Sequence, residues 1–272
     1  MVNLSPENMK KEVLISVAAF VAAASAGSAA VSPIAVSGWN YDMVLNGSGP
    51  YNTSVNGTMD GGFGQFENWT WVEAGTYTNA DGNLQAFNGL VAGVHSSLTG
   101  SGTFEFQDFS SNNVVGLNAG QTGILVLDTP ASYSALSLFG ASGFGGKAAT
   151  VTLTFSDLST TVFAVTQGEG IGTDWFNTAP DKAFAVGGRA SNKSEEGFTR
   201  LFYGDSSVIG INESAFSLSA TDQAKLLSSV SITNDGGDRM AIFAISGAPV
   251  PEPSIALLGG LGIFGLLRRR RA

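Results

Sequence analysis

Residues 150–155 read TVTLTF, so hydroxyl and apolar side chains alternate and Val151, Leu153 and Phe155 share one face of an extended chain. The next four residues, 156–159, read SDLS and favour a turn. Alternation then resumes over residues 162–166, which read VFAVT. Two alternating runs joined by a short turn are typical of a β-hairpin with one buried face. The centre of the chain is therefore predicted to be β structure.

The same pattern extends outward from this hairpin. Over residues 103–109, Phe104 and Phe106 alternate with Glu105 and Gln107. Clusters of Gly, Asn and Asp separate further candidate strands, and only residues 220–227 read as a helix. Those candidates are 41–45, 123–127, 133–139, 183–186, 200–203, 208–211, 230–233 and 240–246. Many short strands with turn signals between them predict an all-β body over residues 31–248, an antiparallel jelly-roll-like β-sandwich.

Charge and composition exclude several classes of protein. Residues 31–250 hold seven Lys or Arg against nineteen Asp or Glu, a net charge of −12. Such a surface repels phosphates, so nucleic acid is not an expected partner. The chain has no cysteine and one histidine, His95, which excludes disulfides, thiolate zinc sites and multi-histidine metal sites. A Ser-His-Asp triad would have to use His95, and no nucleophile-elbow motif surrounds it.

The N-terminal residues 1–30 have the pattern of a signal peptide. Lys10 and Lys11 precede an apolar stretch over residues 13–24, and small residues follow. Ser28 and Ala30 occupy the positions that signal peptidase prefers, which predicts cleavage after Ala30; cleavage after Ala26 is the alternative. An N-terminal helix buried in the fold is the structural alternative to a signal helix.

The C-terminal residues 249–272 have three ordered features. Pro251, Glu252 and Pro253 precede fourteen uncharged residues, 254–267, and then Arg268, Arg269, Arg270 and Arg271. As a helix, the uncharged stretch would span about 21 Å, which is short for a hydrocarbon core of about 30 Å. The arginines would stay on the cytoplasmic side and act as a membrane stop. This predicts a short transmembrane helix that anchors the protein transiently in the inner membrane; a permanent anchor and a helix docked on the body are the alternatives.

This tail resembles the PEP-CTERM sorting signal, which is also called the ice-binding protein C-terminal domain. The resemblance implies a protein of a Gram-negative bacterium that makes extracellular polysaccharide. It further implies recognition by an exosortase, a membrane-embedded transpeptidase-like enzyme, and cleavage at or near residues 251–253. The expected destination is the cell surface or the extracellular matrix. The family name does not make the body an ice-binding protein.

The segment 125–247 has a second, looser resemblance, to galactose-binding-like jelly rolls. It rests on the order of LDTP at 127–130, YSALSL at 133–138, the strand at 151–155, DWF at 174–176 and IFAI at 242–245. That resemblance implies the fold and a possible carbohydrate ligand, with no catalytic residue.

Aromatic residues are the first candidates for such a ligand. Trp69 and Trp71 are two apart, so on a strand they would face the same way and could form a platform for a sugar ring. Trp175 could likewise stack on a sugar ring, with the neighbouring Asp174 carboxylate accepting hydrogen bonds from sugar hydroxyls. Burial in the core is the favoured interpretation of these residues, because aromatic side chains mostly serve cores.

Acidic loops are the second candidates. Asp81 lies beside Gly82, and Asp235 and Asp238 flank Gly236 and Gly237. Carboxylates on glycine-rich loops suit a structural calcium ion, although the same residues are common in ordinary turns. No other cofactor is expected.

Together these features predict an exported, non-enzymatic protein with a structural or weakly glycan-binding body. The alternative is a secreted glycan-active hydrolase that uses two of the acidic residues as paired carboxylates.

Overall fold

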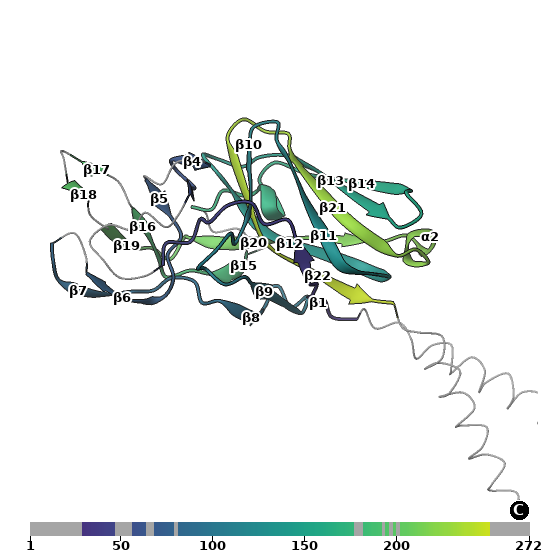
Figure 1. Cartoon of the computed structure of the whole chain (residues 1–272), viewed down its shortest axis with the longest axis horizontal. Coiled ribbons are helices and arrows are strands. Elements are labelled where there is room, and N and C mark those ends of the chain that lie inside the picture. Colours follow the sequence, from purple (N-terminus) through teal and green to yellow (C-terminus); the bar gives the residue numbers. More distant parts are fainter. Residues whose placement is uncertain are drawn as a thin grey trace, which may run out of the picture. The chain divides into compact units, whose positions relative to one another are not determined.

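The computed structural model in Figure 1 describes residues 29–46, 56–63, 68–78, 81–176, 182–191, 194–195, 198–199 and 202–250. Ala30–Pro249 forms one compact unit. No helix within the described ranges is both long enough and apolar enough to span a membrane. The expected signal helix, apart from residues 29–30, and the expected tail helix lie outside the described residues.

Two antiparallel sheets make up most of this unit (Figure 1). The six-stranded sheet has the order β1-β22-β12-β20-β15, and β10 also pairs with β22. Its strands are β1 (Ser32–Pro33), β10 (Val115–Asn118), β12 (Tyr133–Gly143), β15 (Lys182–Ala185), β20 (Gly210–Ser217) and β22 (Arg239–Pro249). The longest strands, β12 and β22, lie side by side in it.

The five-stranded sheet contains the predicted hairpin. Its order is β14-β13-β21-β11-β2, with β2 (Val36–Ser37), β11 (Thr122–Ala131), β13 (Ala149–Phe155), β14 (Thr160–Val165) and β21 (Leu227–Asn234). β13 and β14 pair in continuous antiparallel register from Ala149↔Val165 to Thr154↔Thr160. The hairpin prediction is therefore confirmed, with the turn at residues 156–159.

Shorter strands form additional antiparallel pairs. They are β3 (Gly57–Thr58), β4 (Gly62–Phe63), β5 (Trp69–Thr70), β6 (Gly75–Thr78), β7 (Leu84–Phe87), β8 (Gly93–Ser96), β9 (Thr103–Phe106), β16 (Gly188–Ser191), β17 (Ser194–Glu195), β18 (Phe198–Thr199) and β19 (Phe202–Asp205). β5, β16 and β19 form a three-stranded sheet, and the others pair as β3-β4, β6-β7, β8-β9 and β17-β18. The all-β, mostly antiparallel and sandwich-like architecture predicted from the sequence is confirmed.

Two local predictions need correction. The expected strand at 41–45 is not a strand: the segment makes only isolated bridges, Tyr41↔Val114 and Leu45↔Val72. Its residues 42–45 are all buried, so the apolar run reflects a segment enclosed on all sides. The helix expected over 220–227 is limited to α2 (Ala220–Gln223), because Leu227 already begins β21. A short 3-10 helix, η1 (Gly170–Gly172), lies between β14 and β15.

The core consists of two main clusters of buried apolar side chains. One includes Val151, Leu153 and Phe155 from β13, as the alternation predicted. The other contains Phe104 and Phe106, which are buried while Glu105 between them is exposed. The inward and outward faces of these strands thus follow the period-two pattern of the sequence.

Candidate ligand-binding site

A cavity of about 170 Å³ lies where the chain crosses from β1 in one sheet to β2 in the other. Two backbone hydrogen bonds hold this crossing: Ile34 N–H donates to the Ile245 carbonyl (3.1 Å), and Asp128 N–H donates to the Ala35 carbonyl (3.1 Å). The crossing segment is therefore tied to both sheets. The cavity is lined by Pro33, Ile34, Ala35, Val36, Trp39, Glu105, Gln107, Asp128 and Ile245.

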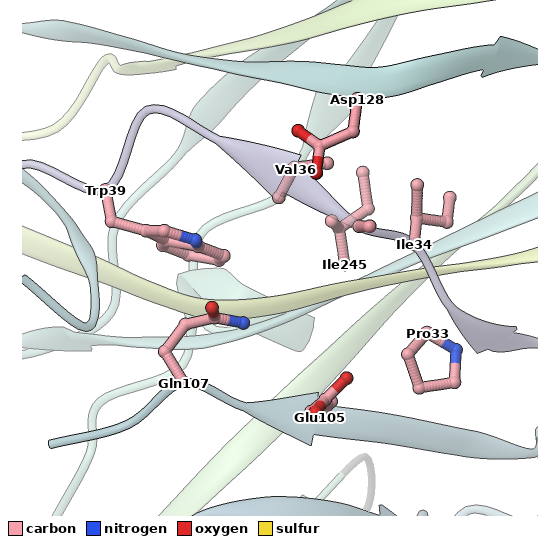
Figure 2. Close-up of a pocket in the computed structure, with 9 residues that line it drawn as sticks. Pro33, Ile34, Val36, Trp39, Glu105, Gln107, Asp128 and Ile245 are labelled. Carbon is pink, nitrogen blue, oxygen red and sulfur yellow. The ribbon is translucent and has the colours of Figure 1, made fainter.

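Polar groups enter this cavity from different strands. In Figure 2, Asp128 comes from β11 on one side, and Glu105 and Gln107 come from β9 and the residues just after it on the other. The indole ring of Trp39 lies at one end (Figure 2). Its Nε1–H is shielded from solvent and has no hydrogen-bond partner among the residues that the structure describes. Two carboxylates, an amide and an unsatisfied donor beside apolar walls suit a ligand whose hydroxyls both donate and accept.

Gly38 allows Trp39 to reach this position. Its φ is +114°, a conformation that L side chains rarely adopt. A Cβ at this position would also collide with the backbone carbonyl of Ile124. The chain can therefore turn sharply after β2 and lie against β11 only because residue 38 has no side chain.

The sequence missed most of this site. The alternation over 103–107 placed Glu105 and Gln107 on the outer face, and that is confirmed for Glu105, which is exposed. No spacing in the sequence relates them to Trp39 or Asp128, because these residues meet only when both sheets have formed.

The predicted aromatic residues do not converge on the cavity. Trp71 and Trp175 are buried, 0% and 2% exposed, with ring centroids 4.6 Å apart. Trp69 is half-buried, and the guanidinium of Arg189 lies 4.5 Å from its ring centroid. Trp71 and Trp175 therefore belong to the core, as the favoured interpretation of the sequence predicted, and Trp69 and Trp71 form no exposed platform.

Arg189 links these rings to a half-buried carboxylate, that of Asp60. Its Nη1 lies 3.3 Å from the Asp60 Oδ2, and its guanidinium lies 4.6 Å from the Phe176 ring centroid. Burial raises the pKa of Asp60, while the Arg189 charge lowers it. This group of side chains packs the three-stranded sheet against the larger core.

Asp174 is used in local turns. One carboxylate oxygen accepts from the Phe176 N–H (2.8 Å), and the other accepts from the Gly145 N–H. These contacts tie the loop after β12 to the chain that follows η1. Its expected role beside Trp175 as a sugar contact stays a prediction.

The predicted calcium residues lie in two separate connections. Asp81 is in the β6–β7 turn, whereas Asp235 and Asp238 are between β21 and β22. Asp235 accepts from the Thr150 hydroxyl (2.7 Å), and Asp238 lies 3.5 Å from Lys147 Nζ. Among the described residues, no three His, Cys, Asp or Glu side chains are grouped closely enough to hold a metal ion.

The two ends of the body lie on neighbouring strands. β1 runs antiparallel to β22, with Ser32 opposite Gly247 and Pro33 opposite Ser246. Ala30, the predicted cleavage residue, is exposed just before β1. The next residue, Val31, is buried and donates its N–H to the Ser101 carbonyl (2.9 Å). The sorting residues 251–253 and the arginines 268–271 lie outside the described residues.

Comparison with known proteins concerns only the C-terminal end of the chain. No curated protein matches the chain. Residues 249–271 match the family described as the PEP-CTERM protein-sorting motif. This match confirms the resemblance of the tail to the PEP-CTERM sorting signal. The matched residues extend from Pro249, at the end of β22, to Arg271. The chain therefore carries a PEP-CTERM sorting motif that begins at the last residue of β22, which implies export to the cell surface and processing by an exosortase.

Proposed function

We propose that this protein is made with a removable signal peptide, held briefly in the inner membrane by its tail, and released to the cell surface or the polysaccharide matrix. The sorting motif at 249–271 is the observation that carries this proposal. Signal peptidase acts after Ala30, and an exosortase acts at or near Pro251, Glu252 and Pro253. The uncharged residues 254–267 and the four arginines are removed with the tail.

The ends of the body support this order of events. β22 ends at Pro249, so cleavage at 251–253 removes no residue of a strand. Cleavage after Ala30 likewise leaves β1 and the buried Val31 intact. Both processing steps therefore leave every strand of the body whole.

Mass spectrometry of the exported protein tests the sorting step. We expect the mature form to begin at Val31 and to lack residues 254–272. Substituting Pro251 and Glu252 together by alanine should leave the protein in the membrane fraction with its tail attached. The matched control, Glu169→Gln, alters an exposed carboxylate in the body and should be processed normally. An exported wild type that retains its arginines contradicts the proposal.

The strand order supports a jelly-roll fold for the body. Eight strands form the orders β10-β22-β12-β20 and β14-β13-β21-β11. Along the chain, β10 is the first of these eight strands and β22 is the last, and the two pair with each other. The two orders also place consecutive strands β11 and β12 in different sheets. Two interleaved four-stranded sheets of this kind are the double-sheet arrangement of a jelly roll.

For the body, we propose weak binding of a neutral glycan at the cavity beside Trp39. The indole provides an apolar surface and an unsatisfied N–H donor. Asp128, Glu105 and Gln107 provide acceptors for sugar hydroxyls. A single cavity of about 170 Å³ accommodates little more than one sugar unit, so the affinity should be low and avidity should matter.

A glycan array and a polysaccharide pull-down with the exported protein test this second part. Trp39→Phe keeps an aromatic ring but removes the N–H donor and part of the indole surface, and should weaken retention at least about tenfold, the effect of losing one good hydrogen bond. Asp128→Asn should also weaken it, whereas Glu169→Gln should not. No retention of the wild type on any glycan removes the adhesion proposal and leaves the sorting proposal standing.

The hydrolase alternative now has one specific pair of acids. Glu105 and Asp128 line the same cavity, as paired carboxylates must for glycoside cleavage. If the body is such an enzyme, the wild type releases new reducing ends from a polysaccharide, and both Glu105→Gln and Asp128→Asn abolish that release. Retention of polysaccharide without any cleavage favours adhesion.

A further inference from the structure

The outer edge of the five-stranded sheet lacks the usual features that prevent strands from pairing between molecules. β14 ends the sheet order, and in the described part of the chain it pairs with β13 alone. Its six residues, TTVFAV, include no charge and no proline. Its register with β13 is continuous and contains no bulge. A regular edge of this kind presents backbone donors and acceptors to a further strand.

The other edge strands of the two main sheets, β1, β2, β10 and β15, are all shorter than β14. β1 has two residues and ends in Pro33, and β2 also has only two residues. β15 has four residues, begins with Lys182 and has a shift in register against β20. Short strands, proline, lysine and bulges each discourage edge-to-edge pairing. Among these edges, β14 alone combines length, regularity and the absence of charge.

We propose that a second copy of this chain pairs with β14 along this edge, antiparallel and about a two-fold axis through Val162. On β14, Thr160, Val162 and Ala164 face outward and are exposed, whereas Phe163 packs against Phe216. An antiparallel pair keeps each face continuous across both molecules. Centring the axis on Val162 therefore pairs it with its own copy and sets Thr160 opposite Ala164. The result is one ten-stranded sheet with a closed, isologous interface.

Charge favours a second copy at this position. Residues 31–250 carry a net charge of −12, so most approaches between two copies bring acidic groups together. The proposed register brings no charged residues opposite each other: Asp157, in the turn before β14, would face Gln167 of the partner. The six-residue contact is small, so we expect a weak dimer that dissociates on dilution.

Sedimentation of the exported protein over a range of concentrations tests the pairing. The wild type should double its mass with increasing concentration. Val162→Lys should remain a monomer, because the two-fold axis would set two lysines side by side. The control, Ile124→Lys, changes a similarly exposed residue on an inner strand of the same face, 51% exposed against 61% for Val162, and should dimerise as the wild type does.

Cysteine cross-linking tests the position of the axis. The chain has no cysteine, so a single introduced thiol can bond only to its copy in a second molecule. Val162→Cys should form a covalent dimer under mild oxidation, whereas Ile124→Cys should not. A wild type that stays monomeric at every concentration overturns the proposal, and so does cross-linking that is equal for the two variants. Circular dichroism confirms that each variant is folded.

Discussion

Asp42 should make the folded body more stable in mild acid than at neutral pH. The residue is 6% exposed and lies in the apolar segment 42–45. Its carboxylate accepts from Asn113 Nδ2 (2.7 Å), and its backbone N–H donates to Asn56 Oδ1 (2.9 Å). No lysine or arginine forms an ion pair with it among the described residues. Burial raises its pKa to about 6, although the Asn113 hydrogen bond lowers it.

The direction of the pH effect follows from this pKa. The ordinary value for the group is 3.8, so between about pH 4 and 6 the folded protein keeps a proton that the unfolded chain loses. Stability therefore falls as the pH rises through this window. A difference of about two pKa units corresponds to roughly 3 kcal/mol. Because solvent near the surface screens part of this, we expect a net effect of about 1–2 kcal/mol.

Asp42→Asn is the perturbation that isolates the charge. The new amide has the shape of the protonated acid and can still accept from Asn113. At pH 7.5 we expect the variant to be about 1–2 kcal/mol more stable than the wild type, with the gain disappearing near pH 4. Urea unfolding of residues 31–249, followed by tryptophan fluorescence at several pH values, gives the difference directly.

Asp108→Asn is the matched control. Asp108 is exposed, and hydrogen bonds from Ser110 lower its pKa. The carboxylate is therefore favoured in the folded state, and its contribution is present at neutral pH and lost in acid. Its replacement should change stability in the direction opposite to Asp42→Asn. A gain for Asp42→Asn that is the same at pH 4 and pH 7.5, or an Asp42 carboxyl that titrates below 4 by NMR, refutes the reasoning.

Two further predictions concern buried charges, measured by the same urea unfolding. Glu213 is 6% exposed, and its carboxylate accepts hydrogen bonds from the hydroxyls of Ser97 (2.8 Å), Thr99, Ser101 (2.9 Å) and Ser137 (2.6 Å). Glu213→Gln should therefore cost about 1–3 kcal/mol of stability, because the amide turns one acceptor into a donor. A cost no larger than that of Glu169→Gln would argue against a stabilising role of these four hydroxyl hydrogen bonds. Arg189→Lys should cost about 1–2 kcal/mol, because an ammonium cannot stack on Trp69 and Phe176 while it pairs with Asp60. Unchanged stability and unchanged tryptophan emission in Arg189→Lys would remove stacking as the cause.

The parts of the fold that the sequence predicted are those set by local alternation. The hairpin at 149–165 and the burial of Phe104 and Phe106 follow from side chains that alternate between core and solvent. Residues 41–45 were wrongly predicted as a strand. This segment is buried but makes only isolated bridges, and its apolar sequence resembles that of a buried strand. Residue 227 was misassigned because the short helix α2 and the strand β21 follow each other within four residues.

The candidate site could not be predicted in the same way. Trp39 and Asp128 are separated by almost ninety residues and meet because β2 pairs with β11. This pairing involves only two residue pairs and depends on the sharp turn at Gly38. Gly38 is one of 36 glycines in the chain, and nothing in the neighbouring sequence distinguishes it from the others. Its role becomes visible only in the assembled sheets.

The position of β22 connects the fold with the sorting tail. β22 is the last strand of the body, yet it lies inside the six-stranded sheet and pairs with β1, β10 and β12. It contributes Phe243 and Ile245 to the core, where they are 1% and 2% exposed, so removing β22 would take both side chains out of the core. The sheet can therefore close only after residues up to 249 have been exported. A cut before Pro249 would destroy the sheet, whereas a cut at 251–253 would free a body whose folding is already complete.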